Sequence, residues 1–600
     1  MGRGGLRQGP LVVLGGLLAL YLAIPLLAFL VRLATSSDTG FSESGLFGAF
    51  WTSAIAATIS TGIIAVVGIP LAYVLARSRG PISTVVGFLV AVPLALPPVM
   101  SGILLIYIAG PYTSIGSVID FSNTLAGIVL AQTFVASPFL VVVARAAFSS
   151  VDPSLYDRAA SLGHRELSRF VRVALPSASD SIRAGLLLAW LRAFGEYGAT
   201  VIIAFHPYSL PVFTELQFES TGLTTTQAPT ALAIGLAAFV VLLSHLRWKT
   251  LHRRTEGRPV PSAPSPVASS PLGFDLDHRL GSFHLRLCHE GATQRLAILG
   301  PSGSGKSATL RCLAGLYGSA PGSVRYGGAE LSRTRTEHRG IGYVPQGSTL
   351  FPRLTVWRQL LFGTEADPAR AAYWFERLGL TGLEDRLPSE LSGGQRQRVA
   401  LAQSLSCSPS LLLLDEPLSA LDTPVRTELR RELRALQIET GISTVLVTHD
   451  PEEAALLADE ILVIVDGQIA QAGTREELFA RPASKEVARL LGISNLFPAH
   501  VERTGTIASG RVTIDVPTLD FPPGAPVWWS IRPDRVVLGH GAYRGNLLEL
   551  ADLGTTSEAF VQLGEELVLH YRGRLPNVGG ITAVVVDLPP EAISIWPRAT

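Results

Sequence analysis

The residues with the clearest chemical meaning form a glycine-rich run between an apolar segment and a helical pattern. Residues 295–299 are apolar enough to predict a buried strand, and the pattern from residue 308 onward predicts a helix. The run between them is Gly300, Pro301, Ser302, Gly303, Ser304, Gly305, Lys306 and Ser307. In this strand–loop–helix context the glycines allow backbone N–H groups to surround phosphate oxygens, and the helix N-terminus adds its dipole. The run therefore predicts a P-loop.

A second reason to assign chemistry to Lys306 is the scarcity of lysine. The chain has 49 basic residues, and only Lys249, Lys306 and Lys485 among them are lysines. We expect Lys306 to reach the β- and γ-phosphates of a nucleotide and Ser307 to ligate Mg²⁺.

Two carboxylates follow another predicted strand. Residues 411–414 are four leucines, and Asp415 and Glu416 come directly after them. We expect Asp415 to belong to the Mg²⁺ shell and Glu416 to polarise the attacking water. Asp415 by itself could equally cap the strand end.

Two further polar side chains follow strand-like segments. Residues 444–448 predict a strand that ends at His449, and residues 343–345 lead to Gln346. We expect His449 to contact the γ-phosphate and Gln346 to sense Mg²⁺ and the water. A strand-end histidine or a loop glutamine alone is more often structural.

A second phosphate-binding surface is predicted at the start of the helical run 396–405. The residues before it present a hydroxyl and bare backbone N–H groups, which bind anions at a helix start, and they are Ser392, Gly393, Gly394 and Gln395. In isolation such a run is an N-cap turn.

Taken together and in this order, the motifs closely resemble those of ABC ATPases over residues 272–490, and residues 419–422 match that family's D-loop. The resemblance implies ATP and Mg²⁺ as cofactors. It also implies two ATPase domains that close head to tail, each ATP lying between one chain's P-loop and the other's signature run. Glu416 would be the base, His449 the γ-phosphate contact, and Gln346 the link to the membrane domain.

The start of the ATPase region departs from the family pattern. The adenine-stacking aromatic that usually precedes a glycine is replaced by Leu280, before Gly281. Phe283 is a candidate substitute, and this Leu-Gly start resembles molybdate-importer ATPases.

Composition shows which elements must hold these motifs. The chain has 600 residues, too many for one domain, and a mean hydropathy of +0.35. Charged residues number 24 in the first 250 positions and 73 in the other 350, so the first part is predicted to be a membrane domain. A purely soluble enzyme is excluded. The net charge of +1 gives no reason to expect nucleic acid, and three scattered cysteines favour neither a disulfide framework nor a zinc site.

Six apolar stretches are long enough to span a bilayer. They lie near residues 11–32, 51–76, 83–109, 123–144, 184–206 and 229–246. The first is too long for the apolar region of a signal peptide, so we expect it to be retained. Arginines gather before the first stretch, in alternate loops and after the last, which predicts a cytoplasmic N-terminus and a cytoplasmic ATPase domain.

The longest predicted cytoplasmic loop covers about residues 150–183 and contains Asp157 and Gly163. An ordinary amphipathic connector is one interpretation. The loop also resembles the coupling loop of ABC importer permeases, whose Glu-Ala-Ala is followed at fixed spacing by Gly and by Leu-Pro. Here Asp157, Arg158 and Ala159 replace Glu-Ala-Ala, whereas the spacing from Gly163 to the Leu-Pro pair matches.

A carboxylate, Glu196, lies inside the predicted span 184–206. Such a group marks either a translocation pathway or a buried structural contact, here with Arg192 one turn away. The run from Gly195 to Thr200 resembles permeases for molybdate, tungstate and sulfate.

These observations predict a multidomain protein: a six-helix all-α transmembrane permease (1–250), a Pro/Ser-rich linker (251–271), an α/β P-loop ABC ATPase (272–495) and a small C-terminal β-barrel (496–600). Residues 531–534 resemble the regulatory barrel of importer ATPases, which either binds a ligand or braces the dimer. The resemblance implies a homodimeric ATP-hydrolysing importer in the cytoplasmic membrane, working with a separate solute-binding protein. We expect the solute to be a small oxyanion, molybdate first. The alternatives are sulfate, tungstate or another solute, and a membrane-anchored ATPase that does not transport.

Overall fold

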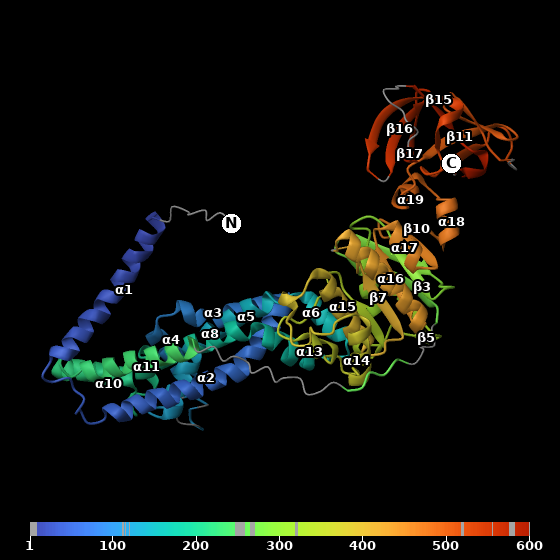
Figure 1. The fold of residues 1–600 in the computed structure, drawn as a ribbon. Helices are drawn as coiled ribbons and strands as arrows, with labels where there is room; N and C mark the ends of the chain where they lie inside the picture. The colour runs from blue at the N-terminus through green and yellow to red at the C-terminus, as the bar shows by residue number, and fades with distance from the viewer. Residues whose placement is uncertain are drawn as a thin grey trace. The chain divides into compact units, whose positions relative to one another are not determined.

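The computed structural model describes residues 9–110, 113–114, 116–118, 121–245, 259–264, 270–318, 322–347, 349–419, 421–517, 521–554, 556–574 and 583–598 (Figure 1). The chain divides into two compact units, Met1–Asp152 with Ala174–Arg253 and Pro153–Val173 with Arg254–Thr600. The segment Pro153–Val173 therefore groups with the second unit, although the chain before and after it belongs to the first. Most of the predicted linker 251–271, and Ala420 of the predicted D-loop, lie outside the described residues.

The first unit is helical. Its helices are α1 (Gly9–Thr35), α2 (Leu46–Arg77), α3 (Pro81–Ala95), α4 (Pro98–Ala109), α5 (Leu125–Ser149), α8 (Leu175–Phe194), α9 (Gly198–Ile203), α10 (Leu210–Thr221) and α11 (Gln227–His245). Among the described residues, four stretches are long and apolar enough to cross a membrane: Val12–Thr35, Leu46–Arg77, Leu125–Ser149 and Gln227–Ser244.

Two of the six spans predicted as single helices are broken, so those two predictions were wrong. The stretch 83–109 divides into α3 and α4 because Pro97 and Pro98 interrupt it, and a proline disfavours helical geometry in the residue before it. The stretch 184–206 divides into α8 and α9, since α8 ends at Gly195 and α9 begins at Gly198. The helix α10 was not predicted.

Small residues bring the helices of this unit together. Ala56 on α2, Ala131 on α5 and Ala199 on α9 are completely buried in one apolar cluster. A Cβ added to Gly68 on α2 would lie 3.1 Å from the side chain of Val141 on α5. Close backbone approach of this kind is how helices associate in lipid, where burial of apolar surface gives little driving force.

The second unit is built on a ten-stranded sheet in the order β5-β4-β1-β2-β10-β9-β3-β8-β7-β6. Its strands are β1 (Leu272–Leu280), β2 (Phe283–His289), β3 (Arg295–Leu299), β4 (Gly322–Tyr326), β5 (Ala329–Glu330), β6 (Ile341–Val344), β7 (Leu411–Asp415), β8 (Ser443–Thr448), β9 (Glu460–Val465) and β10 (Gln468–Thr474). The neighbours β3, β8, β7 and β6 are parallel to one another. Their carboxyl ends therefore meet at one edge of the sheet, where ligands bind in open α/β sheets.

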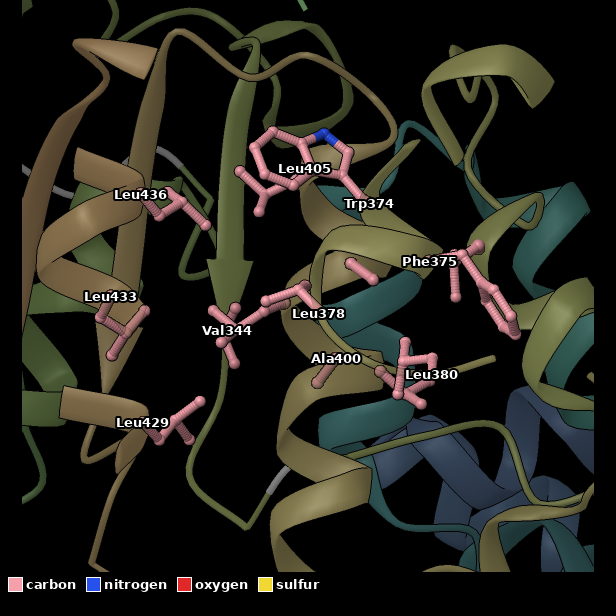
Figure 2. Close-up of a cluster of buried hydrophobic side chains, with 14 of the residues drawn as sticks. Val344, Trp374, Phe375, Leu378, Leu380, Ala400, Leu405, Leu429, Leu433 and Leu436 are labelled. Carbon is pink, nitrogen blue, oxygen red and sulfur yellow. The ribbon is translucent and has the colours of Figure 1, made fainter. Parts of the chain in front are cut away.

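Helices pack on this sheet and extend beyond it. They are α12 (Lys306–Ala314), α13 (Val356–Leu360), α14 (Pro368–Arg377), α15 (Gly393–Leu405), α16 (Thr423–Thr440), α17 (Pro451–Leu457), α18 (Arg475–Ala480) and α19 (Lys485–Leu490). Figure 2 shows one buried cluster, in which Trp374 of α14, Leu405 of α15 and Leu433 of α16 gather beside Val344 of β6. One core therefore holds both α15 and β6.

The segment Pro153–Val173 contributes α6 (Pro153–Ser161) and α7 (Glu166–Arg169), followed by a π-helical turn, Phe170–Ala174. One face of α6 is buried, with Tyr156, Arg158 and Ala159 nearly or fully inaccessible. The segment therefore forms a helix, a turn and a second short helix, and it belongs to the second unit.

The C-terminal part has two antiparallel sheets, in the orders β13-β12-β11-β14-β19 and β17-β16-β15-β18. The strands are β11 (Leu496–Arg503), β12 (Thr506–Ser509), β13 (Val512–Asp515), β14 (Pro526–Ile531), β15 (Val537–Asp552), β16 (Ser557–Leu563), β17 (Leu567–Gly573), β18 (Ala583–Asp587) and β19 (Ile593–Pro597). Both sheets share one apolar core that contains Trp529, Leu569 and Val586.

Candidate functional site

The glycine-rich run lies where the sequence predicts it, between β3 and α12. Gly303 and Gly305 have φ angles of 84° and 100°, in the left-handed region that glycine tolerates. Lys306 begins α12, is 5% exposed, and its Nζ donates to the carbonyl oxygens of Gly300 and Pro301 at 2.8 Å each. Burial lowers the pKa of Lys306, while the carboxylates of Glu416 and Asp415 oppose this shift. The carbonyl oxygens of the loop therefore hold the Lys306 ammonium group on the concave side of the loop, where phosphate binding requires a positive charge.

Two oxygen donors lie side by side next to this loop. Ser307 Oγ donates to Asp415 Oδ1 at 2.9 Å, and the Tyr343 hydroxyl approaches Asp415 Oδ2 at 3.4 Å. Burial raises the pKa of Asp415, and the hydrogen bond from Ser307 opposes this. A buried carboxylate beside a hydroxyl at a phosphate loop fits a Mg²⁺ ion, because Mg²⁺ prefers oxygen ligands.

Glu416 has a strained backbone with a φ of 44°, which is uncommon for a residue other than glycine. Its N–H donates to the Val447 carbonyl at 2.9 Å, which fixes β7 against β8 at this point. Gln346 Nε2 donates to Glu416 Oε2 at 3.1 Å, and His449 Nδ1 lies 3.5 Å from the same oxygen. Gln346, Glu416 and His449, which are widely separated in sequence, thus converge on one carboxylate.

These groups line one cavity of about 570 Å³. Its predicted lining residues are Ser302, Gly303, Gly305, Lys306, Ser307, Gln346, Glu416 and His449, and Leu280 and Phe283 lie at its wall. A Cβ added to Gly305 would lie 3.1 Å from the ring of Phe283, and one added to Gly467 would lie equally close. The ring of Phe283 is therefore packed against the P-loop.

The signature run does not line this cavity. Ser392 caps α15: its Oγ accepts from Gln395 N at 3.3 Å, and Gln395 Oε1 accepts from Ser392 N at 2.9 Å. Gly393 and Gly394 form the first turn of the helix. The run is thus a capping box at a helix start, and the two predicted phosphate-binding surfaces are separate within one chain.

The predicted coupling residues Asp157 and Gly163 contact the ATPase part of the second unit. Asp157 Oδ2 lies 3.7 Å from Arg311 Nη2 on α12, the helix that begins at Lys306. Gly163 has a φ of 90°, and its N–H closes the last turn of α6 by donating to the Ala160 carbonyl. Thr364 N donates to the Leu162 carbonyl at 3.0 Å. Gly163 itself lies beside Thr364, whose Oγ1 a Cβ at this position would overlap.

Two other contacts of this segment were not predicted. His164 Nε2 lies 2.7 Å from the Phe362 carbonyl, and its Nδ1 lies 2.8 Å from Ser168 Oγ. Ser154 Oγ lies 3.0 Å from Thr349 Oγ1, three residues after Gln346. The sequence alone gave no signal for the Phe362 and Thr349 contacts, because each joins positions about 200 residues apart.

Glu196 lies in the break between α8 and α9 of the first unit. It is 1% exposed, its Oε1 accepts from Ala199 N at 2.8 Å, and Arg192 forms an ion pair with it. The Arg192 contact is one of the two alternatives raised from the sequence. A role for Glu196 in translocation stays a prediction.

Comparison with known proteins agrees with this geometry. Residues 289–419 match the ABC transporter family, and residues 68–255 match the inner membrane component of binding-protein-dependent transport systems. An Fe(3+) ions import ATP-binding protein of Rhizobium meliloti is 39% identical over 289 residues, which cover 47% of this chain and 73% of the relative. The chain belongs to the ABC transporter family.

Other relatives of this ABC transporter are ATP-binding import proteins as well. A sulfate/thiosulfate import ATP-binding protein of Chromobacterium violaceum is 42% identical, over 40% of this chain and 68% of the relative. One from Rhizobium meliloti is 37% identical, over 50% of this chain and 87% of the relative. Among solved structures, a dimeric ATP-binding cassette bound to ADP and Pi is 26% identical over 34% of this chain and 98% of that chain, with a TM-score of 0.30. The two family matches and the import proteins among the relatives show that the chain joins an importer permease to an ATP-hydrolysing domain.

Proposed function

We propose that this ABC transporter imports a small tetrahedral oxyanion, with molybdate as the first candidate. The Leu280-Gly281 start supports molybdate, because it resembles molybdate-importer ATPases. The run from Gly195 to Thr200 supports the wider oxyanion class, because it resembles permeases for molybdate, tungstate and sulfate. Sulfate or thiosulfate is the second candidate, and it is supported by the names of two relatives. Import of Fe(3+), the ion in the name of another relative, would contradict both oxyanion candidates.

The observation that carries the proposal is the union of two features in one compact unit. The first is the convergence of Lys306, Gln346, Glu416 and His449 on one cavity. The second is the docking of Pro153–Val173, a segment that interrupts the helical first unit, within the same unit as that cavity. The unit that contains the ATPase cavity is therefore joined to the helical unit through a short segment of the chain, Pro153–Val173.

The residues at the cavity support a hydrolytic step. Lys306 binds the phosphates and compensates their charge. Glu416 accepts a proton from the water that attacks the γ-phosphorus, while the bond from that phosphorus to the ADP oxygen breaks. Gln346 and His449 hold the Glu416 carboxylate from two sides, at 3.1 and 3.5 Å. His449 is also the group with which we expect the γ-phosphate to make contact.

Mg²⁺ belongs to this proposal through Ser307, Asp415 and Gln346. Ser307 and Asp415 are already in contact with each other, and Gln346 lies at the same cavity. When bound, the ion neutralises charge on the β- and γ-phosphate oxygens.

We also propose that the working assembly is a homodimer. The signature residues Ser392 to Gln395 do not line the chain's own cavity, so a second copy has to supply them to each ATP. One permease and one ATPase per chain would then give two of each. The resemblance to binding-protein-dependent permeases adds an extracytoplasmic solute-binding protein as partner. The arginine distribution supports a multi-pass protein of the cytoplasmic membrane with its ATPase domain in the cytoplasm.

The test is uptake by intact cells of the source organism. Cells that lack the gene, cells complemented with the wild-type gene, and cells complemented with Glu416→Gln would each be given radiolabelled molybdate, sulfate, thiosulfate or Fe(3+). We expect wild-type complementation alone to restore oxyanion uptake. Restored Fe(3+) uptake without oxyanion uptake would overturn the substrate class. If no solute is imported although the purified protein hydrolyses ATP, the non-transporting anchored ATPase would be the better interpretation.

A further inference from the structure

The most unusual contact of the coupling segment is made by Arg158, the residue at which the segment departs from the Glu-Ala-Ala pattern. Its side chain is completely buried. The guanidinium donates to the carbonyl oxygens of Tyr343 and Ala400, and its Nε donates to Gln403 Oε1 at 3.0 Å. All three acceptors are neutral. Burial lowers the pKa of Arg158 to about 10, so the side chain is still a cation at neutral pH.

Neighbouring ionisable groups do not neutralise this cation. Cys407 lies close enough to interact with it, but burial raises the pKa of that thiol to about 11, so the thiol is uncharged. The adjacent carboxylate, Asp157, faces Arg311 on α12. A buried charge held by neutral groups is expensive, because the desolvation cost is met by hydrogen bonds alone. A residue whose burial costs this much, at the position where the resembled motif has alanine, points to a specific role.

The acceptors of Arg158 belong to two different working parts of the ATPase. Tyr343 is on β6, the strand that leads to Gln346. Ala400 and Gln403 are on α15, the helix that begins at the signature residue Ser392. One rigid, planar guanidinium therefore connects β6, which leads to Gln346 at the chain's own cavity, to α15, which presents Ser392 to the cavity of the second copy in the proposed homodimer.

The hydrogen bonds continue beyond Arg158. Gln403 Nε2 donates to the Gln359 carbonyl at 2.9 Å, and Gln359 Nε2 donates to the Phe351 carbonyl at 2.7 Å. Gln359 Oε1 accepts from Phe351 N at 3.2 Å, and both glutamine side chains are fully buried. Phe351 lies five residues after Gln346, so the network returns to the loop that carries Gln346. A buried network in which each member is satisfied has one preferred geometry.

We propose that Arg158 is a positioning residue that fixes α15 relative to β6 whenever the coupling segment is docked. The coupling segment, defined as Pro153–Val173, thereby sets the orientation in which Ser392 is presented and the path of the loop at Gln346. Arg158 touches neither nucleotide nor solute. The inference rests on the proposed function only where solute transport is measured.

The first measurement is amide hydrogen exchange in the full-length chain, compared between wild type and Arg158→Met. Methionine has a similar length and no charge, so the apolar replacement is expected to leave the melting temperature unchanged or raised. Exchange in α15 should become about tenfold faster, because the charge-assisted hydrogen bonds that Arg158 donates to Ala400 and Gln403 are lost. Exchange in residues 349–360 should rise with it, because Gln403 connects α15 to Gln359 and Phe351. Exchange in α16 should not change. Arg165→Met is the matched control, since Arg165 is exposed on the same segment, and it should exchange like wild type.

The second measurement is ATP hydrolysis and solute uptake in proteoliposomes. For Arg158→Met, the KM for ATP should stay within about twofold of wild type, while solute carried per ATP falls by about tenfold or more. Arg158→Lys should restore part of this ratio at most, because an ammonium group does not reproduce a planar fork with three acceptors. Gln403→Leu should give the same defect, and the double variant should be no worse than either single one.

Three results would overturn the proposal: unchanged α15 exchange in Arg158→Met, faster exchange in all helices together with a lower melting temperature, or an unchanged ratio of solute to ATP. If Arg158→Met does not fold, Gln403→Leu decides the question by breaking the next link of the network. Hydrogen exchange needs no solute. A wrong oxyanion assignment would therefore remove the transport measurement but leave the exchange result to support or overturn the role of Arg158.

Discussion

Replacing Gly163 by valine should uncouple transport from ATP hydrolysis. Gly163 has a φ of 90°, a conformation that a β-branched residue adopts only under strain. A Cβ at this position would overlap Thr364 Oγ1 and lie 3.2 Å from Thr364 Cβ. Valine adds two further methyl groups to that collision. The backbone at Gly163 and the contact with Thr364 cannot both be kept, so the coupling segment should leave its docking site.

The size of the effect follows from the backbone term alone. Holding a residue other than glycine in a sparsely populated φ/ψ region costs ~1–3 kcal/mol. A midpoint of about 2 kcal/mol lowers the equilibrium constant for docking of the segment by roughly 30-fold, because each 1.4 kcal/mol is a factor of ten. The steric overlap with Thr364 adds to this value. Gly163→Ala combined with Thr364→Ala should recover part of the coupling, since the overlap is relieved and the backbone cost is kept.

The assay compares ATPase activity and solute uptake in the same proteoliposomes, with and without the solute-binding protein. We expect Gly163→Val to keep basal hydrolysis, while stimulated hydrolysis and uptake fall together. The matched control is Gly382→Val. Gly382 has a φ of 88°, and nothing lies within 4 Å of a Cβ added there. This variant carries the same backbone strain in the same unit but collides with nothing.

Normal uptake by Gly163→Val would refute the reasoning, because it would mean that the coupling segment works undocked or that its backbone adapts at no cost. Equal loss of uptake in Gly382→Val would also refute it, since general destabilisation would then explain both variants.

Four other changes test the site. Glu416→Gln should abolish steady-state hydrolysis and trap a nucleotide-bound closed dimer, seen by size-exclusion chromatography; turnover within a few-fold of wild type would contradict the role of the carboxylate. Lys306→Arg should weaken ATP binding, because the loop encloses Nζ at 2.8 Å from two carbonyls and a planar fork does not fit there; unchanged nucleotide affinity would contradict this. Burial lowers the pKa of His164 below its ordinary 6.5, with the nearby charges of Arg172 and Arg169 adding to the shift. The docked segment therefore prefers neutral histidine. The ratio of solute carried per ATP should be at its full value above about pH 6.5 and should fall as the pH drops through the lowered pKa of His164. In His164→Gln the same ratio should not change with pH. Phe283→Ala should raise the KM for ATP and for GTP alike if the ring only supports the P-loop, and a selective loss of ATP would show that it recognises adenine.

The sequence was sufficient to predict the elements that position the ATPase residues, because these elements are encoded locally. A P-loop needs eight consecutive residues that connect a strand to a helix. The structure has residues 300–305 between β3 and α12, and Lys306 and Ser307 are the first residues of α12. Asp415, Glu416 and His449 each directly follow an apolar strand. Parallel strands in one sheet align their carboxyl ends, so convergence of these side chains followed from the sequence pattern once a parallel sheet was assumed.

Hydropathy was less successful with the membrane helices. It located the apolar stretches, but it did not show that 83–109 and 184–206 are interrupted. An 18- to 20-residue average is insensitive to a single break at Pro97-Pro98 or at Gly195-Glu196-Tyr197. Backbone geometry, and not mean apolarity, decides where a helix ends.

Only the tertiary structure decided which side chains meet across long separations. Arg158 was a departure from a motif in the sequence; in the structure it is a fully buried donor to residues about 185 to 245 positions away. Gly163 lies beside Thr364, which is 201 positions away in the sequence. Local sequence determines strands, turns and phosphate loops because their hydrogen bonds close within a few residues. A docking surface depends on the shape formed by several packed elements, and no short pattern in the sequence encodes that shape.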